Sequence, residues 1–289
     1  MSKITTPKKA AASKKAPVEK HTPASSTTAK RYKYRLTLEY DGSKLSGWQK
    51  QDDAVTIQGT LLAAAAELFE DNAVDIQGCG RTDAGVHALN YTAHLESANG
   101  KISPAVILKK LNDLLPPAIV VLGVESCGAR FHARHNCVGR SYLYQIAHRK
   151  TAFQKKYVWW VKEPLNVKAM AEAAQVLTGM HDFASFAEKQ ELKKSTQVLV
   201  NGVYLYEDEE MLRLRVIGSH FLWKMVRRMA GVLVEVGKGN LTAKDVKDFL
   251  ETTTTAPSRL TAPPSGLFFE KAFYDEKEFD KFLAAAKKE

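Results

Sequence analysis

Two kinds of hydrophobic spacing alternate along most of the chain. Alternating apolar and polar side chains predict strands at 34–40 and 140–148, because successive strand residues face opposite sides of a sheet. Residues 90–95, 198–206 and 211–217 are predicted to be strands as well. Shorter apolar stretches bounded by turn residues predict further strands at 74–78, 119–124 and 267–274. Apolar residues three and four positions apart, or helix-start residues, predict helices at 56–69, 104–111, 166–178, 220–236 and 242–250, and a short helix at the end.

These elements fall into two halves with a similar order of strands and helices. The two strands around residues 207–210 form an expected hairpin, which favours antiparallel pairing. The predicted fold class is α+β, with a central, mainly antiparallel sheet built from two similar α/β halves and helices on one face. We expect the halves to be residues 33–138 and 139–276, preceded by a basic tail at 1–32 and followed by a helix or tail at 277–289.

Charge is concentrated at the N-terminus. The chain has 289 residues with 42 Lys and Arg against 32 Asp and Glu, a net charge of +10. Residues 1–30 hold seven Lys and one Glu and contain no aromatic residue, so this segment carries +6 and is predicted to be disordered. It could tether nucleic acid, keep the chain soluble or act as a transit peptide, although transit peptides favour Arg and the first Arg is Arg31.

Several functional classes are excluded by composition. The longest apolar run, Leu61 to Ala66, is far shorter than a membrane span, and the N-terminus lacks the apolar stretch of a secretion signal. Cys79, Cys127 and Cys137 are odd in number and widely spaced, which fits neither a disulfide framework nor a metal site. We therefore expect free thiols, a reducing, cytoplasmic location and no membrane partner.

The densest candidate chemistry lies in residues 78–88. Three glycines, Arg81, Asp83 and His87 occur together between two predicted strands. Glycines let a ligand approach the backbone, and a carboxylate near a guanidinium can stay ionised and act as a nucleophile or base. The segment lacks the spacing of a phosphate-binding loop, and judged by composition alone Asp83 is more typical of a turn-capping residue.

The string Gly-Arg-Thr-Asp-Ala-Gly-Val-His-Ala at 80–88 resembles the signature of the tRNA pseudouridine synthase A family. Further segments are similar to family motifs in the family's order, at 40–43, 47–51, 56–58, 131–134, 140–144, 179–186, 221–237 and 266–267. The resemblance covers residues 34 to about 274. It implies the pseudouridine synthase fold and a homodimer that converts uridine to pseudouridine in the anticodon stem-loop of tRNA, typically at positions 38, 39 and 40. It also implies that no cofactor and no metal are used.

The resemblance assigns catalytic roles by position. The family's essential carboxylate falls on Asp83, as nucleophile or as support for the intermediate. The motif's arginine falls on Arg81, implied in flipping the target nucleotide out of its helix. The pocket tyrosine falls on Tyr142, whose ring would stack on uracil and whose hydroxyl could move a proton at C5. Arg227 is expected to pair with Asp83.

Further residues are assigned to substrate binding. Leu267 is expected to form an apolar wall of the pocket. Phe131, His132 and Arg134 belong to a segment, 131–135, that resembles an RNA-contacting strand in which Arg134 would meet phosphate. The chain departs from the family at Val198, where members usually have an arginine; Lys193 and Lys194 could replace its charge.

Simpler interpretations remain open for individual residues. Without the motif, Arg227 or its neighbour Arg228 would be a surface cation on an apolar helix, and Tyr142 an ordinary strand aromatic. His87 is expected to be a hydrogen-bonded structural residue, and His181 with Asp182 a structural loop. Two rival functions are an RNA-binding protein that has lost catalysis and a glycoside-cleaving enzyme that uses Asp83, although no motif supplies the second carboxylate that the latter usually needs.

Overall fold

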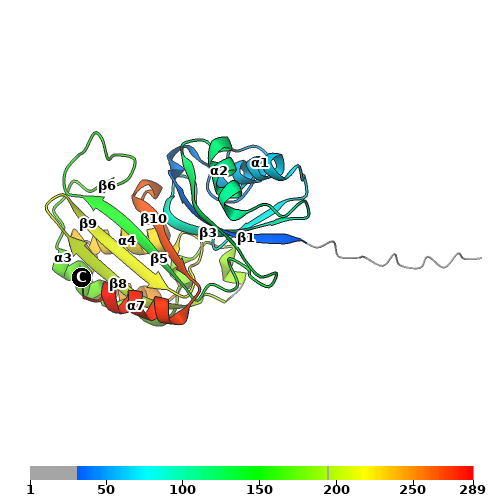
Figure 1. The fold of residues 1–289 in the computed structure, drawn as a ribbon. Helices are drawn as coiled ribbons and strands as arrows, with labels where there is room; N and C mark the ends of the chain where they lie inside the picture. Colours follow the sequence, from blue (N-terminus) through cyan, green and yellow to red (C-terminus); the bar gives the residue numbers. More distant parts are fainter. Residues whose placement is uncertain (1–30, 194, 289) are drawn as a thin grey trace, which may run out of the picture. The chain divides into compact units, whose positions relative to one another are not determined.

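One ten-stranded sheet runs through the computed structural model, which describes residues 31–193 and 195–288 (Figure 1). Eight strands follow the order β4-β1-β3-β10-β5-β9-β8-β7, while β2 pairs with β3 and β6 with β5. Antiparallel pairing predominates, and the β3–β10 and β5–β6 pairs are parallel. The predicted α+β class with a mainly antiparallel sheet is confirmed. The strands are β1 (Tyr32–Tyr40), β2 (Asp75–Gly78), β3 (His87–Ser97), β4 (Ile119–Ser126), β5 (Gly139–Ala147), β6 (Trp159–Trp160), β7 (Gly179–Asp182), β8 (Gln197–Glu207), β9 (Met211–Gly218) and β10 (Leu267–Phe273).

Helix starts follow the capping signals of the sequence. The side chain of Thr56 accepts a hydrogen bond from Gly59 N at the start of α1, and Thr242 forms a capping box with Asp245 at the start of α5. Each cap satisfies backbone N–H groups that a helix start leaves unpaired. The helices are α1 (Ile57–Phe69), α2 (Pro104–Leu114), α3 (Val167–Val176), α4 (Met225–Gly237), α5 (Ala243–Glu251), α6 (Ala256–Arg259) and α7 (Glu276–Ala286).

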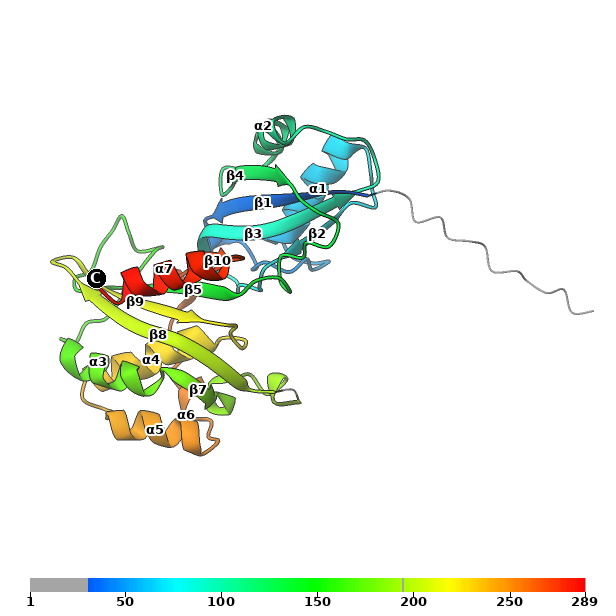
Figure 2. The same cartoon turned by 60° about the horizontal axis from the view of Figure 1, so that its bottom comes forward.

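The C-terminal helix α7 departs from the expected single helical layer. Figure 2 shows α7 on one side of the sheet and α3, α4 and α5 on the other. The reason is a second, smaller hydrophobic cluster formed by Ile217, Phe273, Phe279 and Ala286, which covers the face that α4 leaves free. Phe279 packs so closely on β5 that a Cβ at Gly139 would lie 2.3 Å from its ring.

The two halves of the sheet meet at a short parallel junction. β10, from near the end of the chain, pairs with β3 only through Phe268 opposite His87 and Phe269 opposite Ala88. On its other side β10 runs antiparallel to β5 over most of its length. The start of β3 therefore lies where the chemistry-rich segment 78–88 ends, beside the first residues of β10.

The helix predicted at 220–236 is shorter than expected. α4 begins at Met225 because Lys224 has φ +62°. This left-handed backbone conformation interrupts a right-handed helix, so residues before Lys224 cannot belong to α4. Residues 219–224 instead form a loop between β9 and α4.

No helix of residues 31–193 and 195–288 has the length and apolar character to cross a membrane. The predicted tail at 1–32 lies outside the described residues except for Arg31 and Tyr32, and β1 begins at Tyr32.

Candidate active site

Asp83 lies in the loop between β2 and β3, and this loop is packed from two sides. Gly47 has φ +84°, and a Cβ on it would lie 2.6 Å from the carbonyl oxygen of Thr82. Gly85 has φ +80° and would meet the ring of Pro264 at 3.0 Å. Glycine is required at both positions by the backbone angle and the close approach. The backbone on either side of Asp83 is thus held in one conformation.

Both carboxylate oxygens of Asp83 accept hydrogen bonds from the α4 region. Arg227 Nη1 lies 2.7 Å from Oδ2, and the indole Nε1 of Trp223 donates to Oδ1 at 2.7 Å. Arg227 is itself fixed, because its Nε donates to the carbonyl oxygen of Ala262 at 2.8 Å. The Asp83 side chain is 16% exposed, so this ion pair stands at a partly open surface. The structure contains the Asp83–Arg227 pair that the family resemblance implied.

Trp223 was not among the residues singled out from the sequence. The prediction placed Trp223 within the helix 220–236, and nothing in that prediction directed its side chain toward Asp83. The one signal in the sequence is that Trp223 is a large aromatic residue that does not belong to the apolar face of the predicted helix. The loop conformation of residues 219–224 turns its indole N–H to the carboxylate.

Tyr142 and Leu267 form an apolar wall on neighbouring strands. Tyr142, on β5, is 7% exposed, and its ring makes edge-on contacts with Phe221 and Phe269 at centroid distances of 5.2 and 5.1 Å. Burial raises the pKa of Tyr142, and the nearby charge of Asp83 adds to the rise, so the hydroxyl keeps its proton at neutral pH. Leu267, the first residue of β10, is 5% exposed.

Arg81 and Thr82 point in different directions from the loop. Arg81 is exposed. Thr82 is buried, and its hydroxyl shares a 2.9 Å hydrogen bond with the hydroxyl of Tyr40 on β1. The loop is therefore anchored through Thr82, while the guanidinium of Arg81 is accessible to a ligand.

A buried guanidinium connects three segments around the site. Arg140, at the start of β5, is 7% exposed. It donates from Nε and Nη2 to the carbonyl oxygen of Cys79 at 3.1 and 2.9 Å, from Nη1 to that of Ser219 at 2.6 Å, and from Nη2 to that of Arg134 at 3.0 Å. These carbonyls belong to the Asp83 loop, to the loop that carries Trp223 and to the segment predicted to contact RNA. Arg140 lies in the segment 140–144 that resembles a family motif, but the sequence assigned it no role.

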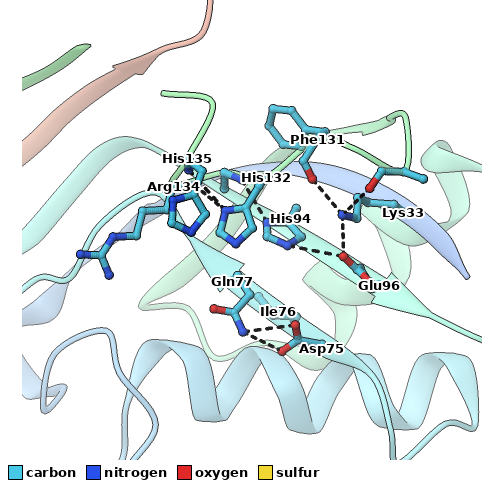
Figure 3. Close-up of polar contacts among 12 residues, drawn as sticks. Lys33, Asp75, Ile76, Gln77, His94, Glu96, Phe131, His132, Arg134 and His135 are labelled. Carbon is cyan, nitrogen blue, oxygen red and sulfur yellow. Dashed lines mark hydrogen bonds and ion pairs between the residues drawn. The ribbon is translucent and has the colours of Figure 1, made fainter. Parts of the chain in front are cut away.

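The segment 131–135 is not a strand, which corrects the expectation. It forms a turn, because local side chains satisfy its backbone N–H groups: Asn136 Oδ1 accepts from His132 N at 2.6 Å and His132 Nδ1 from Arg134 N at 3.1 Å. Figure 3 shows the imidazoles of His132, His135 and His94 grouped beside this turn. Phe131 and His132 are half-buried, and Arg134 is exposed.

Residues of the sheet hold this turn in place. Lys33 Nζ donates to the carbonyl oxygens of Ala129 and Phe131 at 3.0 and 2.8 Å and pairs with Glu96 at 2.6 Å (Figure 3). His94, 2% exposed, accepts from Ala133 N at 3.1 Å. Burial, with the neighbouring His132, lowers the pKa of His94 to about 4, so it is neutral at pH 7.

Other residues flagged from the sequence lie away from Asp83 or have structural contacts. His87 is buried and accepts from Gly42 N at 3.1 Å, as expected for a hydrogen-bonded residue. His181 and Asp182 form part of β7 rather than a loop, with Asp182 accepting from Thr196 Oγ1 at 2.6 Å. Val198 is fully buried in β8 opposite His181. Lys193 lies in a short 3-10 helix, and Lys194 lies outside the described residues.

Comparison with known proteins bears on this arrangement. A family described as tRNA pseudouridine synthase matches residues 37–136 and 173–275, which is more than half of the chain. The chain belongs to the tRNA pseudouridine synthase family. All the predicted site residues except Tyr142 lie inside the matched segments, and Tyr142 lies between them.

Individual family members are similar over nearly their whole length. A protein of Bacillus cereus named tRNA pseudouridine synthase A 2 is 39% identical over 240 residues, covering 82% of this chain and 97% of its own. The tRNA pseudouridine synthase A of Zymomonas mobilis is 37% identical over 245 residues, covering 84% and 99%. The tRNA pseudouridine synthase A 2 of Clostridium tetani is 35% identical, covering 83% and 98%.

Proposed function

We propose that this chain is an active family member that converts uridine to pseudouridine in the anticodon stem-loop of tRNA, at positions 38, 39 and 40. Asp83 is the essential carboxylate, and it acts after the target nucleotide has been flipped out of its helix. One observation carries the proposal: Asp83, within a string that resembles the family's signature, pairs with Arg227 at 2.7 Å and lies close enough to Tyr142 for its charge to add to the rise that burial causes in the pKa of that tyrosine.

The reaction needs few groups because it is an isomerisation. The N1–C1′ bond of uridine breaks, the base turns, and a C5–C1′ bond forms; C5 loses a proton and N1 gains one, so no atom is gained or lost overall. Asp83 supplies the anionic oxygen, either by attack on C1′ or C6 or by supporting a glycal intermediate. Tyr142, which keeps its hydroxyl proton, stacks on the base and moves the proton at C5.

The exposed cations suit an RNA substrate. Arg81 is accessible two residues from Asp83, and its guanidinium can fill the space that a flipped base leaves in the helix. Phe131, His132 and Arg134 lie on a turn held by Lys33 and Arg140, where Arg134 can contact phosphate. Leu267 forms an apolar boundary for the base. Such phosphate contacts fix the position of the RNA without reading its sequence.

Two further properties belong to this proposal. The protein acts as a homodimer, with one tRNA contacting both subunits, and it works in the cytoplasm. The dimer rests on the family resemblance, and light scattering on the purified chain measures it directly. A mass corresponding to one chain of 32.1 kDa would contradict it.

The test uses a tRNA transcript that carries uridine at positions 38, 39 and 40 and contains no modified base. After incubation with the protein, pseudouridine is mapped by position, and binding is measured on the same RNA. We expect pseudouridine at these positions and nowhere else in the transcript. Binding without any pseudouridine would favour the rival function of a catalytically inactive RNA-binding protein.

A further inference from the structure

Trp223 contacts the candidate catalytic carboxylate directly and has no assigned role. Its Nε1 donates to Asp83 Oδ1 at 2.7 Å, while Arg227 occupies Oδ2. A carboxylate held at one oxygen can still rotate about its own axis, and a second donor at the other oxygen removes that freedom. The indole N–H therefore fixes the plane of the Asp83 carboxylate.

The same side chain presents a ring to solvent. Trp223 is 43% exposed although its indole N–H is bonded to the partly buried Asp83. Single-stranded or flipped bases stack on exposed aromatic rings, and this contact does not depend on the base. Because the Trp223 ring is held beside Asp83, a nucleotide that reaches this carboxylate would contact the ring.

The backbone next to Trp223 is held in a strained conformation. Lys224 has φ +62°, which residues other than glycine rarely adopt. Glu188 fixes it there, since Glu188 Oε1 accepts from Lys224 Nζ at 2.9 Å and from Arg228 Nη2 at 2.7 Å. The hydrogen bond from Lys224 lowers the pKa of Glu188, so this clamp is charged at neutral pH. Strained residues of this kind persist where surrounding contacts over-determine them, and they cluster at functional sites.

We propose that Trp223 is a positioning residue for Asp83 and a base-stacking residue for the RNA. Its N–H orients the carboxylate, and its exposed ring contacts the nucleotide that enters the site. This inference rests on the proposed function. It also explains why α4 starts at Met225 rather than at His220: a continued helix would lack the left-handed turn at Lys224 that sets the direction of Trp223.

Two variants separate the two roles by kinetics. Trp223→Phe keeps a ring but loses the N–H, so we expect kcat to fall about tenfold with KM unchanged. Trp223→Ala loses both, so the same fall in kcat should come with a KM about tenfold higher. Trp160→Phe is the matched control, because Trp160 is 40% exposed but lies on β6, and it should retain wild-type kcat and KM. Thermal midpoints of all variants report their folding.

Each kinetic outcome decides one role. Wild-type kcat in Trp223→Phe would overturn the orienting role. Equal KM values in Trp223→Phe and Trp223→Ala would overturn the stacking role.

A spectrum without RNA keeps this inference separate from the proposed function. The chain has four tryptophans, and the indole N–H signal of Trp223 in a nitrogen–proton correlation spectrum is identified by its loss in Trp223→Phe. In Asp83→Asn that signal should move, because the hydrogen bond to a carboxylate is lost, while the signal of Trp160 stays. An unmoved Trp223 signal overturns the positioning role, whether or not the wild type makes pseudouridine. A moved signal in a protein that makes none would leave the contact standing and remove the proposed function.

Discussion

Two parts of the described chain, which we call the N-terminal half (residues 31–138, before β5) and the C-terminal half (residues 139–193 and 195–288), bring different groups to the candidate site. The N-terminal half supplies Asp83 and the exposed Arg81 from one loop. The C-terminal half supplies the groups that contact Asp83, Arg227 and Trp223, together with the Tyr142 wall. The carboxylate and its partners thus come from opposite sides of a two-residue parallel junction. The site exists only when the halves are joined correctly.

The difference also concerns how each half is held. The Asp83 loop depends on close steric contacts, which are those of Gly47 with the backbone at Thr82 and of Gly85 with the ring of Pro264, and a side chain at either glycine would disrupt them. The C-terminal partners depend on charged hydrogen bonds, at Arg227 and at the strained Lys224. The close contacts at the two glycines fix where the carboxylate is, and the charged contacts fix which way it faces. Changes on the two sides should therefore differ in size and in kind.

The largest effect should come from the N-terminal half. Asp83→Asn keeps the shape of the side chain but removes the anionic oxygen, so kcat should fall roughly 10⁴-fold while tRNA affinity stays within about threefold. Single-turnover pseudouridine formation and filter binding measure the two quantities. Asp113→Asn, on the exposed surface of α2, is the control and should behave as wild type. Loss of binding together with turnover would mean that Asp83 is structural.

The next effect tests the C-terminal partner. Arg227→Gln removes the charge opposite Asp83 Oδ2, and we expect kcat to fall about 10²- to 10³-fold, the range for loss of one preorganised electrostatic contact. The matched control is Arg259→Gln, an exposed arginine on α6 that should leave kcat unchanged. A kcat within about threefold of wild type in Arg227→Gln would show that the ion pair does not support catalysis.

A smaller effect is expected at the residue that connects the halves. Arg140→Ala removes donors to the carbonyls of Cys79, Ser219 and Arg134, so kcat should fall about tenfold and the thermal midpoint should drop. Millimolar guanidinium should restore part of kcat by refilling the cavity. Arg149→Ala, at an exposed position just after β5, controls for loss of positive charge. Lowered stability with an unchanged kcat would restrict Arg140 to a structural role.

The smallest effect concerns acid stability of the N-terminal half. In the folded protein the pKa of His94 is about 4, below its ordinary value of 6.5. Between these two pH values His94 is protonated in the unfolded chain and neutral in the folded one. The difference stabilises the folded state above pH 6.5, and this stabilisation is lost as the pH falls toward 4. The loss is on the order of 2 kcal/mol in the free energy of unfolding. Urea unfolding at pH 7.0, 5.5 and 4.5 measures it.

Two variants isolate this contribution from the carboxyl groups that titrate in the same range. His94→Gln should show a shallower loss of stability between pH 6.5 and 4.5 than wild type. His148→Gln, at an exposed position after β5, should follow the wild-type curve. Identical pH slopes in all three proteins would contradict the buried, neutral state of His94.

The sequence was sufficient for the parts of the fold that follow from periodicity. Two strand-like runs on either side of the acidic residues 207–210 predicted the β8–β9 hairpin, and Thr56 and Thr242 marked the starts of α1 and α5. It was insufficient for β7, whose four residues are too few to show a period. The side of the sheet on which α7 packs depends on a distant partner cluster, which local pattern does not encode.

The candidate site was predictable to the extent that motifs name residues. Asp83 and its pairing with Arg227 followed from the resemblance, but Trp223 and Arg140 did not. Trp223 reaches Asp83 only because Lys224 takes a left-handed conformation, and apolar spacing instead predicted a helix there. Arg140 acts through backbone carbonyls far away in the sequence, which leave no trace in residue types. The family resemblance predicted a strand at 131–135, but the side chains of Asn136 and His132 satisfy backbone N–H groups there and hold the segment in a turn.

The most direct test of a site shared between the halves is a double-mutant cycle on single-turnover pseudouridine formation, with enzyme in excess over labelled tRNA. It compares wild type, Asp83→Asn, Arg227→Gln and the double variant. If Arg227 acts through Asp83, the double variant should be no slower than Asp83→Asn, within about threefold, because groups that act as a unit are lost together. A double variant whose loss equals the product of the two single losses would contradict this account.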